Sequence, residues 1–122
     1  MQQMTTSMWT YREGIMEPGV SARDVVGYGV EASDGSIGKV DEATYEVGSS
    51  YLVVDTGPWI FGKKVMLPAG VIQSVDHENE KIFVDRTKDE IKNAPEFDDS
   101  FIRDEDYRTK LGSYYGETAS VR

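Results

Sequence analysis

Residues 26–40 read VGYGVEASDGSIGKV, and this stretch indicates the fold class more clearly than any other. Apolar residues alternate with glycines over 26–30, which is the period-two pattern of a β-strand. The Asp34-Gly35 dipeptide that follows is favoured in tight hairpin turns, because both residues tolerate positive φ. The stretch therefore predicts an antiparallel hairpin whose second strand begins at Ile37.

The second strand of this hairpin contains a parity conflict. In a regular strand Val40 would face one side of the sheet, whereas Ala43 and Tyr45 would face the other. One extra residue near Asp41 and Glu42, forming a β-bulge, would restore a single apolar face. We therefore expect a bulge at this point, as is common where a sheet curls toward a barrel.

The chain after this hairpin continues as short strand patterns separated by turn signals. Further strands are expected over residues 51–56, 64–67, 71–75 and 82–85. The first of them, YLVVDT, is rich in aromatic and β-branched residues and is expected to be the central, most buried strand. A corner is expected at Pro68, which cannot donate to a strand ladder. Five or six short strands followed by helices predict a mainly β fold, namely a small antiparallel β-barrel with a short C-terminal helical segment.

Helix signals follow the strands. Thr87 and Glu90 fit a capping box, in which the hydroxyl and the carboxylate satisfy free amides of a first helical turn. That helix is expected to end near Asn93, because the proline two residues further on disfavours the α conformation of the residue before it. A second helix is expected over residues 103–111, with Gly112 as its stop signal.

Composition divides the chain into three expected parts. Residues 1–21 are rich in Met, Thr and Gln and lack periodicity, so we expect a flexible N-terminal arm. Residues 22–97 are expected to form the barrel domain, and residues 98–122 an acidic linker with the helical tail. Trp9 and Tyr11 give the arm two aromatic anchors, which could dock on its own barrel or on a neighbouring molecule.

The overall composition limits the classes of function. The 122 residues fit one domain, and the absence of Cys excludes disulfides, thiol catalysis and Cys-ligated metal sites. The net charge of -9, with no basic run longer than Lys63-Lys64, argues against direct nucleic-acid binding, which needs a basic face. The sequence contains no stretch of the roughly 20 apolar residues that a membrane span needs. A soluble, cytoplasmic protein is expected.

The sequence offers little that could carry catalysis or bind a metal. His77 is the only histidine and lies within the acidic turn 76–80, where a structural role is the simpler interpretation. Alternating acids in that turn begin like a calcium loop, but Lys81 and Thr87 occupy the places where the loop needs Gly and Glu. We therefore expect no catalytic residues, no cofactor and no metal.

The most unusual feature is an apolar cluster in a turn. Trp59, Ile60 and Phe61 stand between Pro58 and a Gly-Lys-Lys, where turn chemistry favours polar residues. Aromatic side chains of this size dominate interface energetics when they are covered. Two explanations are open: the cluster folds back to cap the barrel, or it contacts another protein. We assign these three residues as the candidate protein-interaction site.

The ordered motifs resemble the PRC-barrel family, which takes its name from the cytoplasmic domain of the photosynthetic reaction-centre H subunit. The same fold forms the C-terminal domain of ribosome maturation factors of the RimM type. The resemblance covers about residues 22–97, and 114–116 resembles the tail of stand-alone bacterial members. It rests on these motifs in order: Val26-Gly27, Val30, Asp34-Gly35, Ile37–Val40, Tyr51–Gly57, Lys64–Pro68, and Ile82–Glu90 with Ala94-Pro95.

What the resemblance implies is a small β-barrel that acts as a protein-interaction module and carries no catalytic residues. Three departures limit the comparison. We expect neither the transmembrane helix of the reaction-centre subunit nor the N-terminal domain of the ribosome maturation factor. Residues 68–70 read Pro-Ala-Gly where the family more often has Pro-Trp-Ser.

The function expected from the sequence is a non-enzymatic adaptor. It would self-associate, with a homodimer as one form, or bind another protein whose identity the sequence does not name. The alternative is a small-ligand or metal-binding barrel protein that uses the barrel mouth and the acidic turn 76–80.

Overall fold

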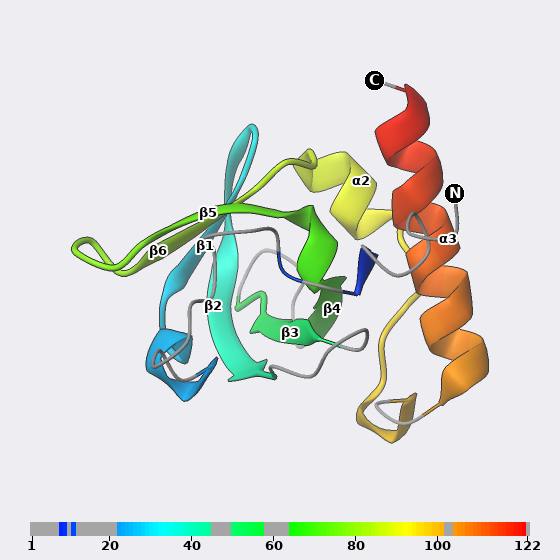
Figure 1. The fold of residues 1–122 in the computed structure, drawn as a ribbon, viewed down its shortest axis with the longest axis horizontal. Helices are drawn as coiled ribbons and strands as arrows, with labels where there is room; N and C mark the ends of the chain where they lie inside the picture. Colours follow the sequence, from blue (N-terminus) through cyan, green and yellow to red (C-terminus); the bar gives the residue numbers. More distant parts are fainter. Residues whose placement is uncertain are drawn as a thin grey trace.

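The computed structural model describes residues 8–9, 11, 22–44, 50–57, 64–101 and 104–121 of the chain. Its strands are β1 (Gly29–Ala32), β2 (Gly35–Ala43), β3 (Tyr51–Asp55), β4 (Lys64–Pro68), β5 (Ile72–Asp76) and β6 (Lys81–Val84). Its α-helices are α2 (Lys88–Lys92) and α3 (Glu105–Val121), and its 3-10 turns are η1 (Ala22–Val25), η2 (Ala69–Val71) and η3 (Asp99–Phe101) (Figure 1).

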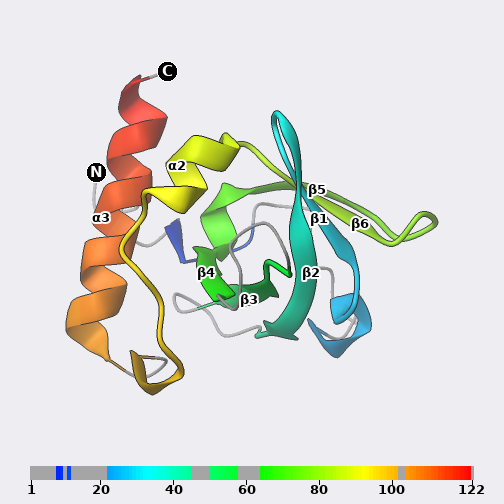
Figure 2. The same ribbon diagram turned by 180° about the vertical axis from the view of Figure 1, so that it is seen from behind.

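The six strands form one strongly coiled sheet in the order β4-β3-β2-β1-β6-β5 (Figures 1 and 2). The prediction of a mainly β fold with six strands and a C-terminal helix is confirmed. The sheet is not closed into a barrel, because β4 and β5 are its two edges and pair only with β3 and β6 in the described part of the chain. The corner expected at Pro68 is present, where η2 links the two edge strands.

The pairing differs from a purely antiparallel sheet at one place. Consecutive strands pair antiparallel except at η2, which bends the chain at a corner without forming a hairpin. The chain therefore reverses its direction four times between β1 and β6, at the β1–β2, β2–β3, β3–β4 and β5–β6 connections. An even number of reversals makes β1 and β6 run in the same direction, and the two strands are indeed paired parallel. The expectation of an entirely antiparallel barrel is corrected to this extent.

The bulge expected in β2 is present. Val40 pairs with Val54 and Glu42 pairs with Val53, so Asp41 is the additional residue on the β2 side. Val40 is buried and Asp41 is exposed, as the sequence parity required. The ladder beyond the bulge leads into β3, whose first four residues are all buried, as predicted for the most buried strand. The expectation that it is also the central strand is corrected, because β3 lies next to the edge strand β4 and the centre of the sheet is formed by β2 and β1.

The capping box at the start of α2 is also confirmed. The Thr87 hydroxyl accepts a hydrogen bond from the Glu90 amide at 3.1 Å, and the Glu90 carboxylate accepts one from the Thr87 amide at 2.8 Å. The turn between β1 and β2 adds a third cap, because the Asp34 carboxylate accepts a hydrogen bond from the Lys88 amide at 2.8 Å. The capping box is a local feature, whereas the Asp34 bond joins distant residues and places the start of α2 against the first hairpin.

Replacing Thr87 with alanine is expected to lower the free energy of unfolding by about 1 kcal/mol, the usual contribution of an N-cap hydroxyl. Urea denaturation of the variant and the wild type measures the difference. Thr109→Ala, at an exposed position of α3, is the matched control and is expected to be neutral or slightly stabilising, because alanine has the higher helix propensity. Equal destabilisation by both substitutions would contradict a specific capping role.

The C-terminal helix corrects one prediction. It was expected to stop at Gly112, but α3 continues to Val121. Glycine inside a helix costs about 1 kcal/mol relative to alanine, and tertiary packing outweighs that cost here. The buried side chains of α3 recur every four residues and form one continuous face, namely Tyr107, Leu111 and Tyr115.

The core extends beyond the predicted barrel segment. Tyr11 and the buried face of α3 belong to the same apolar cluster as the strands, and Trp9 packs against it. The predicted boundaries at residues 21 and 97 stay predictions, but side chains outside them contribute to the core. None of the helices in the described part of the chain combines the length and apolarity needed for a membrane crossing.

Candidate functional site

The predicted interaction residues Trp59, Ile60 and Phe61 lie outside the described residues. What the structure describes is the pair of strands that hold both ends of their loop. The β3–β4 ladder is paired in register up to Asp55 and Lys64. Residues 56–63 therefore connect two strands whose ends are fixed.

The first end of this loop is held by a local turn. The Asp55 carboxylate accepts a hydrogen bond from the Gly57 amide at 2.9 Å, and Gly57 has a φ of 57°. This is an Asx-type turn, and the left-handed conformation at its third residue suits glycine. Between them, Thr56 is buried with 2% of its surface exposed. The chain thus leaves β3 in a defined direction.

The second end carries an exposed ion pair. Lys64 Nζ lies 3.0 Å from Asp41 Oδ2, the bulge residue of β2, with side chains 38% and 40% exposed. A pair this exposed contributes well under about 1 kcal/mol. The pair therefore adds little to the hold that the β3–β4 ladder already has on the start of β4.

The acidic turn between β5 and β6 is organised by its own side chains. The Asp76 carboxylate accepts hydrogen bonds from the Asn79 side chain at 2.8 Å and the Asn79 amide at 3.1 Å, and these bonds lower the pKa of Asp76. His77 Nδ1 lies 2.9 Å from the Tyr28 hydroxyl, with the two rings edge to face. Across the described residues, no three His, Cys, Asp or Glu side chains are grouped to hold a metal ion. The metal-binding alternative therefore gains no support from this turn.

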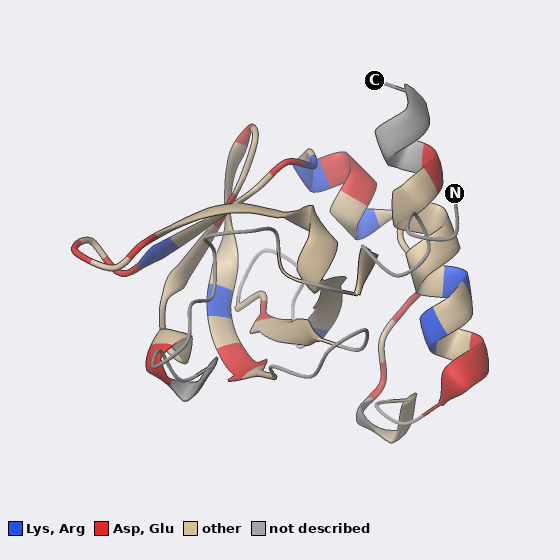
Figure 3. Cartoon of the chain, in the orientation of Figure 1, with Lys and Arg blue, Asp and Glu red and all other residues tan. Residues whose placement is uncertain are grey.

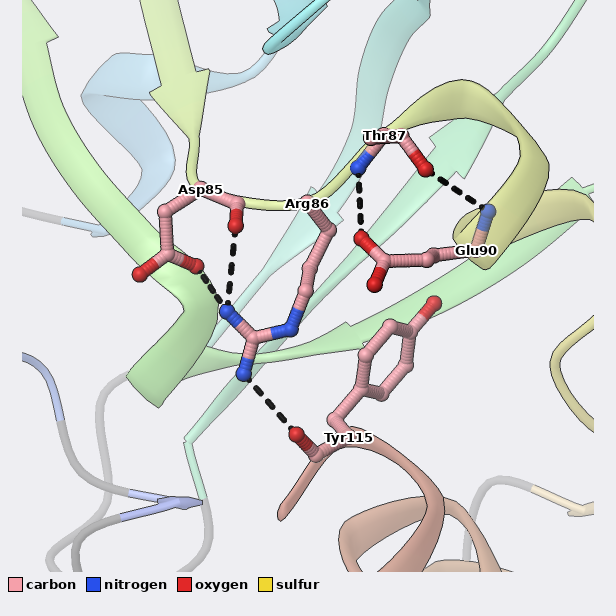
Figure 4. A network of polar contacts seen from close by, with 5 residues as sticks. All are labelled: Asp85, Arg86, Thr87, Glu90 and Tyr115. Carbon is pink, nitrogen blue, oxygen red and sulfur yellow. Dashed lines mark hydrogen bonds and ion pairs between the residues drawn. The ribbon is translucent and has the colours of Figure 1, made fainter. Parts of the chain in front are cut away.

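A buried arginine joins the sheet to the C-terminal helix (Figure 4). Arg86 is 2% exposed, pairs with the Asp85 carboxylate, and donates from Nη2 to the Tyr115 carbonyl at 2.9 Å. Its backbone is fixed after β6, because the Arg86 carbonyl accepts a hydrogen bond from the Ser33 amide at 2.9 Å. The guanidinium is thus placed between the end of β6 and α3, where it contacts both.

Tyrosine hydroxyls add two further bonds to the same helix. Tyr114 donates to the Glu90 carbonyl at 2.6 Å, and Tyr107 donates to the Pro95 carbonyl at 3.2 Å. Burial raises the pKa of Tyr107 well above its usual range, so the phenol stays protonated and able to donate. The helix is therefore attached to α2 and to the segment after it by directional bonds as well as apolar contact.

Trp9 occupies a formed site, which we call the Trp9 seat and define by Ser50, Arg108 and Gly112. The Arg108 guanidinium carbon lies 4.9 Å from the Trp9 ring centroid, within the range of a cation–π contact. A Cβ on Gly112 would lie 2.7 Å from Trp9 Nε1, so only glycine leaves room for the indole. The Ser50 amide donates to the Trp9 carbonyl at 2.8 Å. Figures 1 and 2 show the short N-terminal piece between the sheet and α3.

These contacts place both aromatic anchors of the N-terminal segment against the sheet and α3. Both Trp9 and Tyr11 lie on their own chain, and the Tyr11 hydroxyl donates to the Thr44 carbonyl at the end of β2. Sequence reasoning identified the two anchors but missed the seat. Its one local signal was Gly112, which had been interpreted as a helix stop.

Acidic and basic residues are interspersed along the described part of the chain, as the colours of Figure 3 show. Figure 3 shows acidic residues at the β5–β6 turn, on α2 and at the start of α3, while Lys and Arg lie singly or in close pairs between them. This arrangement agrees with the net charge of -9.

The comparisons with known proteins support a barrel-like fold but do not assign a family or a function. The coiled six-stranded order and the β4–η2–β5 corner define a mainly β, barrel-like class of domain that is not closed. Among the solved structures similar to it is a protein described as the 16S ribosomal RNA processing protein RimM of Pseudomonas aeruginosa, with a TM-score of 0.50 and 19% identity. The match covers 60% of this chain and 47% of RimM, so this chain corresponds to about half of that protein's length. No family model and no curated protein sequence matches the chain.

Proposed function

We propose that this chain is a non-enzymatic, cytoplasmic protein-interaction module that presents the loop of residues 56–63 at one end of a PRC-barrel-like sheet. The observation that carries the proposal is the register of β3 and β4, which are paired up to Asp55 and Lys64 at the two ends of the loop. A fixed base is what a binding loop needs, because a rigid scaffold reduces the entropy lost on association.

The composition of the loop supplies the expected binding energy. A covered Trp or Phe side chain removes roughly 150 to 250 Å² from water, and an aromatic residue at the centre of an interface commonly contributes about 2 kcal/mol or more. Trp59 follows Pro58 and is the first residue to test, with Phe61 next. Ile60 completes the candidate site.

A protein partner suits the charge of this chain better than RNA does. Neutralising phosphates needs clustered Lys and Arg, whereas the sequence carries a net charge of -9. RimM is described as a ribosomal RNA processing protein, which makes ribosomal particles a reasonable bait for this chain. The expected contact with such a particle is with one of its proteins. Self-association, including a homodimer, is the other form that the interaction could take.

The double variant Trp59→Ala with Phe61→Ala tests this proposal. We expect it to lose self-association in light scattering, or to lose its partner in affinity purification from the native host, while its urea midpoint stays near that of the wild type. Val26→Ala is the matched control, because Val26 is an exposed apolar residue, 47% exposed, that lies in a different segment of the chain, between η1 and β1. The control is expected to keep mass and partners unchanged.

Two results would contradict the proposal. If the double variant keeps the wild-type mass and all co-purifying proteins but loses several kcal/mol of stability, the cluster caps its own core. If binding to ribosomal particles survives the double variant and falls steeply with salt, the contact is with RNA phosphates and not with a protein.

A further inference from the structure

The Trp9 seat is specific for one kind of side chain. Gly112 leaves space for an indole, and Arg108 places a cation over its ring at 4.9 Å. The same guanidinium lies 5.2 Å from the Tyr51 ring centroid, so it stands over two aromatic rings at once. A flat aromatic side chain fits this geometry, because its ring can lie under the guanidinium while its edge lies against Gly112, and a cationic side chain would be repelled by Arg108.

The segment that fills the seat is held at three points. The Ser50 amide donates a hydrogen bond to the Trp9 carbonyl, and the Trp9 indole contacts Arg108 and Gly112. The Tyr11 hydroxyl donates to the carbonyl of Thr44, the residue after β2. Ser50 is itself held in place, because its carbonyl accepts a hydrogen bond from the Ala69 amide at 3.0 Å. The site is therefore formed by elements of the sheet and of α3, and its occupant is a short separate segment.

The connection between occupant and body is long enough to reach another molecule. Residues 12–21 separate Tyr11 from η1, and a chain of this length spans up to about 35 Å when extended. Every contact described above would be the same if the segment came from a second copy. Exchange of an identical element is a low-cost route to a dimer, because each contact broken within one molecule is formed between two.

We propose that the Trp9 seat is an exchange site. It holds Met8, Trp9 and Tyr11 of its own chain in the isolated molecule, and it holds the same residues of a second copy when two molecules meet at high concentration. Trp9 and Met8 are only half-buried, so Tyr11 is the one fully buried side chain that opening the site would expose. A short linker gives the intramolecular segment an effective concentration in the millimolar range, so exchange needs protein concentrations approaching that range. This proposal does not depend on the loop of residues 56–63.

Two complementary full-length variants test the exchange. Gly112→Ala blocks the seat but keeps the N-terminal segment, and Trp9→Ala keeps the seat but removes the indole. Each variant alone is expected to sediment as a monomer across a concentration series reaching about 1 mM. Mixed at the same total concentration, they are expected to form a heterodimer, because the segment of the first can enter the seat of the second. Adding Trp59→Ala and Phe61→Ala to both copies separates this dimer from one formed through the loop.

A peptide experiment keeps the proposal testable if Trp9→Ala fails to fold. A fluorescein-labelled peptide of residues 1–16 is titrated with full-length Gly112→Ala and with Gly116→Ala. Gly116 is the matched control in the same helix, since a Cβ there meets nothing within 4 Å. We expect the Gly112→Ala variant to bind the peptide at least tenfold more weakly than the control. A mixture that stays monomeric, or equal peptide affinity for the two glycine variants, would overturn the proposal.

Discussion

Replacing Gly38 with alanine is expected to destabilise the folded chain by about 4 kcal/mol, a large part of the stability of a typical domain. Gly38 lies in β2 with a φ of 149°, and an added Cβ would collide with the Asp55 carbonyl oxygen and lie 2.9 Å from Thr56 Cα. Both obstacles are backbone atoms, at the last residue of β3 and at the residue after it. They cannot move without opening the β2–β3 ladder.

Equilibrium denaturation in urea measures the loss in free energy of unfolding. Faster amide hydrogen exchange in β3 would show that the destabilisation is located at the β2–β3 ladder. Gly29→Ala is the matched control, because Gly29 is also a strand glycine, has no positive φ, and leaves open space for a Cβ. The control is expected to change stability by less than about 1 kcal/mol. A similar small effect at Gly38 would mean that β2 and β3 are further apart than described.

Replacing Arg86 with methionine is expected to cost about 3 kcal/mol. Methionine keeps the length and apolar stem of the side chain but removes the donor to the Tyr115 carbonyl and the charge paired with Asp85. Breaking a buried ion pair from one side usually costs about 3 to 5 kcal/mol, and the lower end applies because the Asp85 side chain is 28% exposed and can be rehydrated. The loss should be greatest in α3, whose attachment includes this contact.

Urea denaturation gives the total effect, and hydrogen exchange of α3 compared with that of β3 gives its location. Lys81→Met is the control, because Lys81 pairs with Glu31 at the surface with side chains 46% and 24% exposed. The control should cost less than about 1 kcal/mol. If the Arg86 variant lost stability evenly in α3 and β3, the guanidinium would support the core as a whole and not attach the helix in particular.

Local rules were sufficient for several details of this fold. The parity conflict around Val40 required a bulge, and the bulge lies at Asp41 because a strand's side chains alternate regardless of its partner. The capping box at Thr87 and Glu90 formed as predicted, since its bonds join residues three apart. The prediction for Trp59, Ile60 and Phe61 stays a prediction, because these residues lie outside the described part of the chain.

The missed features all depend on residues far apart in the sequence. Nothing near Gly112 indicates that Trp9 lies against it, so a rule for helix ends gave the wrong boundary for α3. Arg86 sits at an ordinary strand end, and its role appears only when the Tyr115 carbonyl is brought within 2.9 Å. The parallel pairing of β1 with β6 likewise follows from the corner at η2. The corner changes which strands run in the same direction, and this becomes visible only when the whole sheet is assembled.

The sequence alone thus places the strands, the β2 bulge and the start of α2. The rules behind these predictions are side-chain alternation, turn chemistry and helix caps, and each acts over a few residues and hardly depends on the rest of the chain. The tertiary structure decides which strands become edges, how far α3 extends, and that Trp9 lies between α3 and the sheet. Those outcomes depend on contacts between residues far apart in the sequence, such as Trp9 and Gly112. No local preference outweighs the free energy gained when such surfaces are buried together.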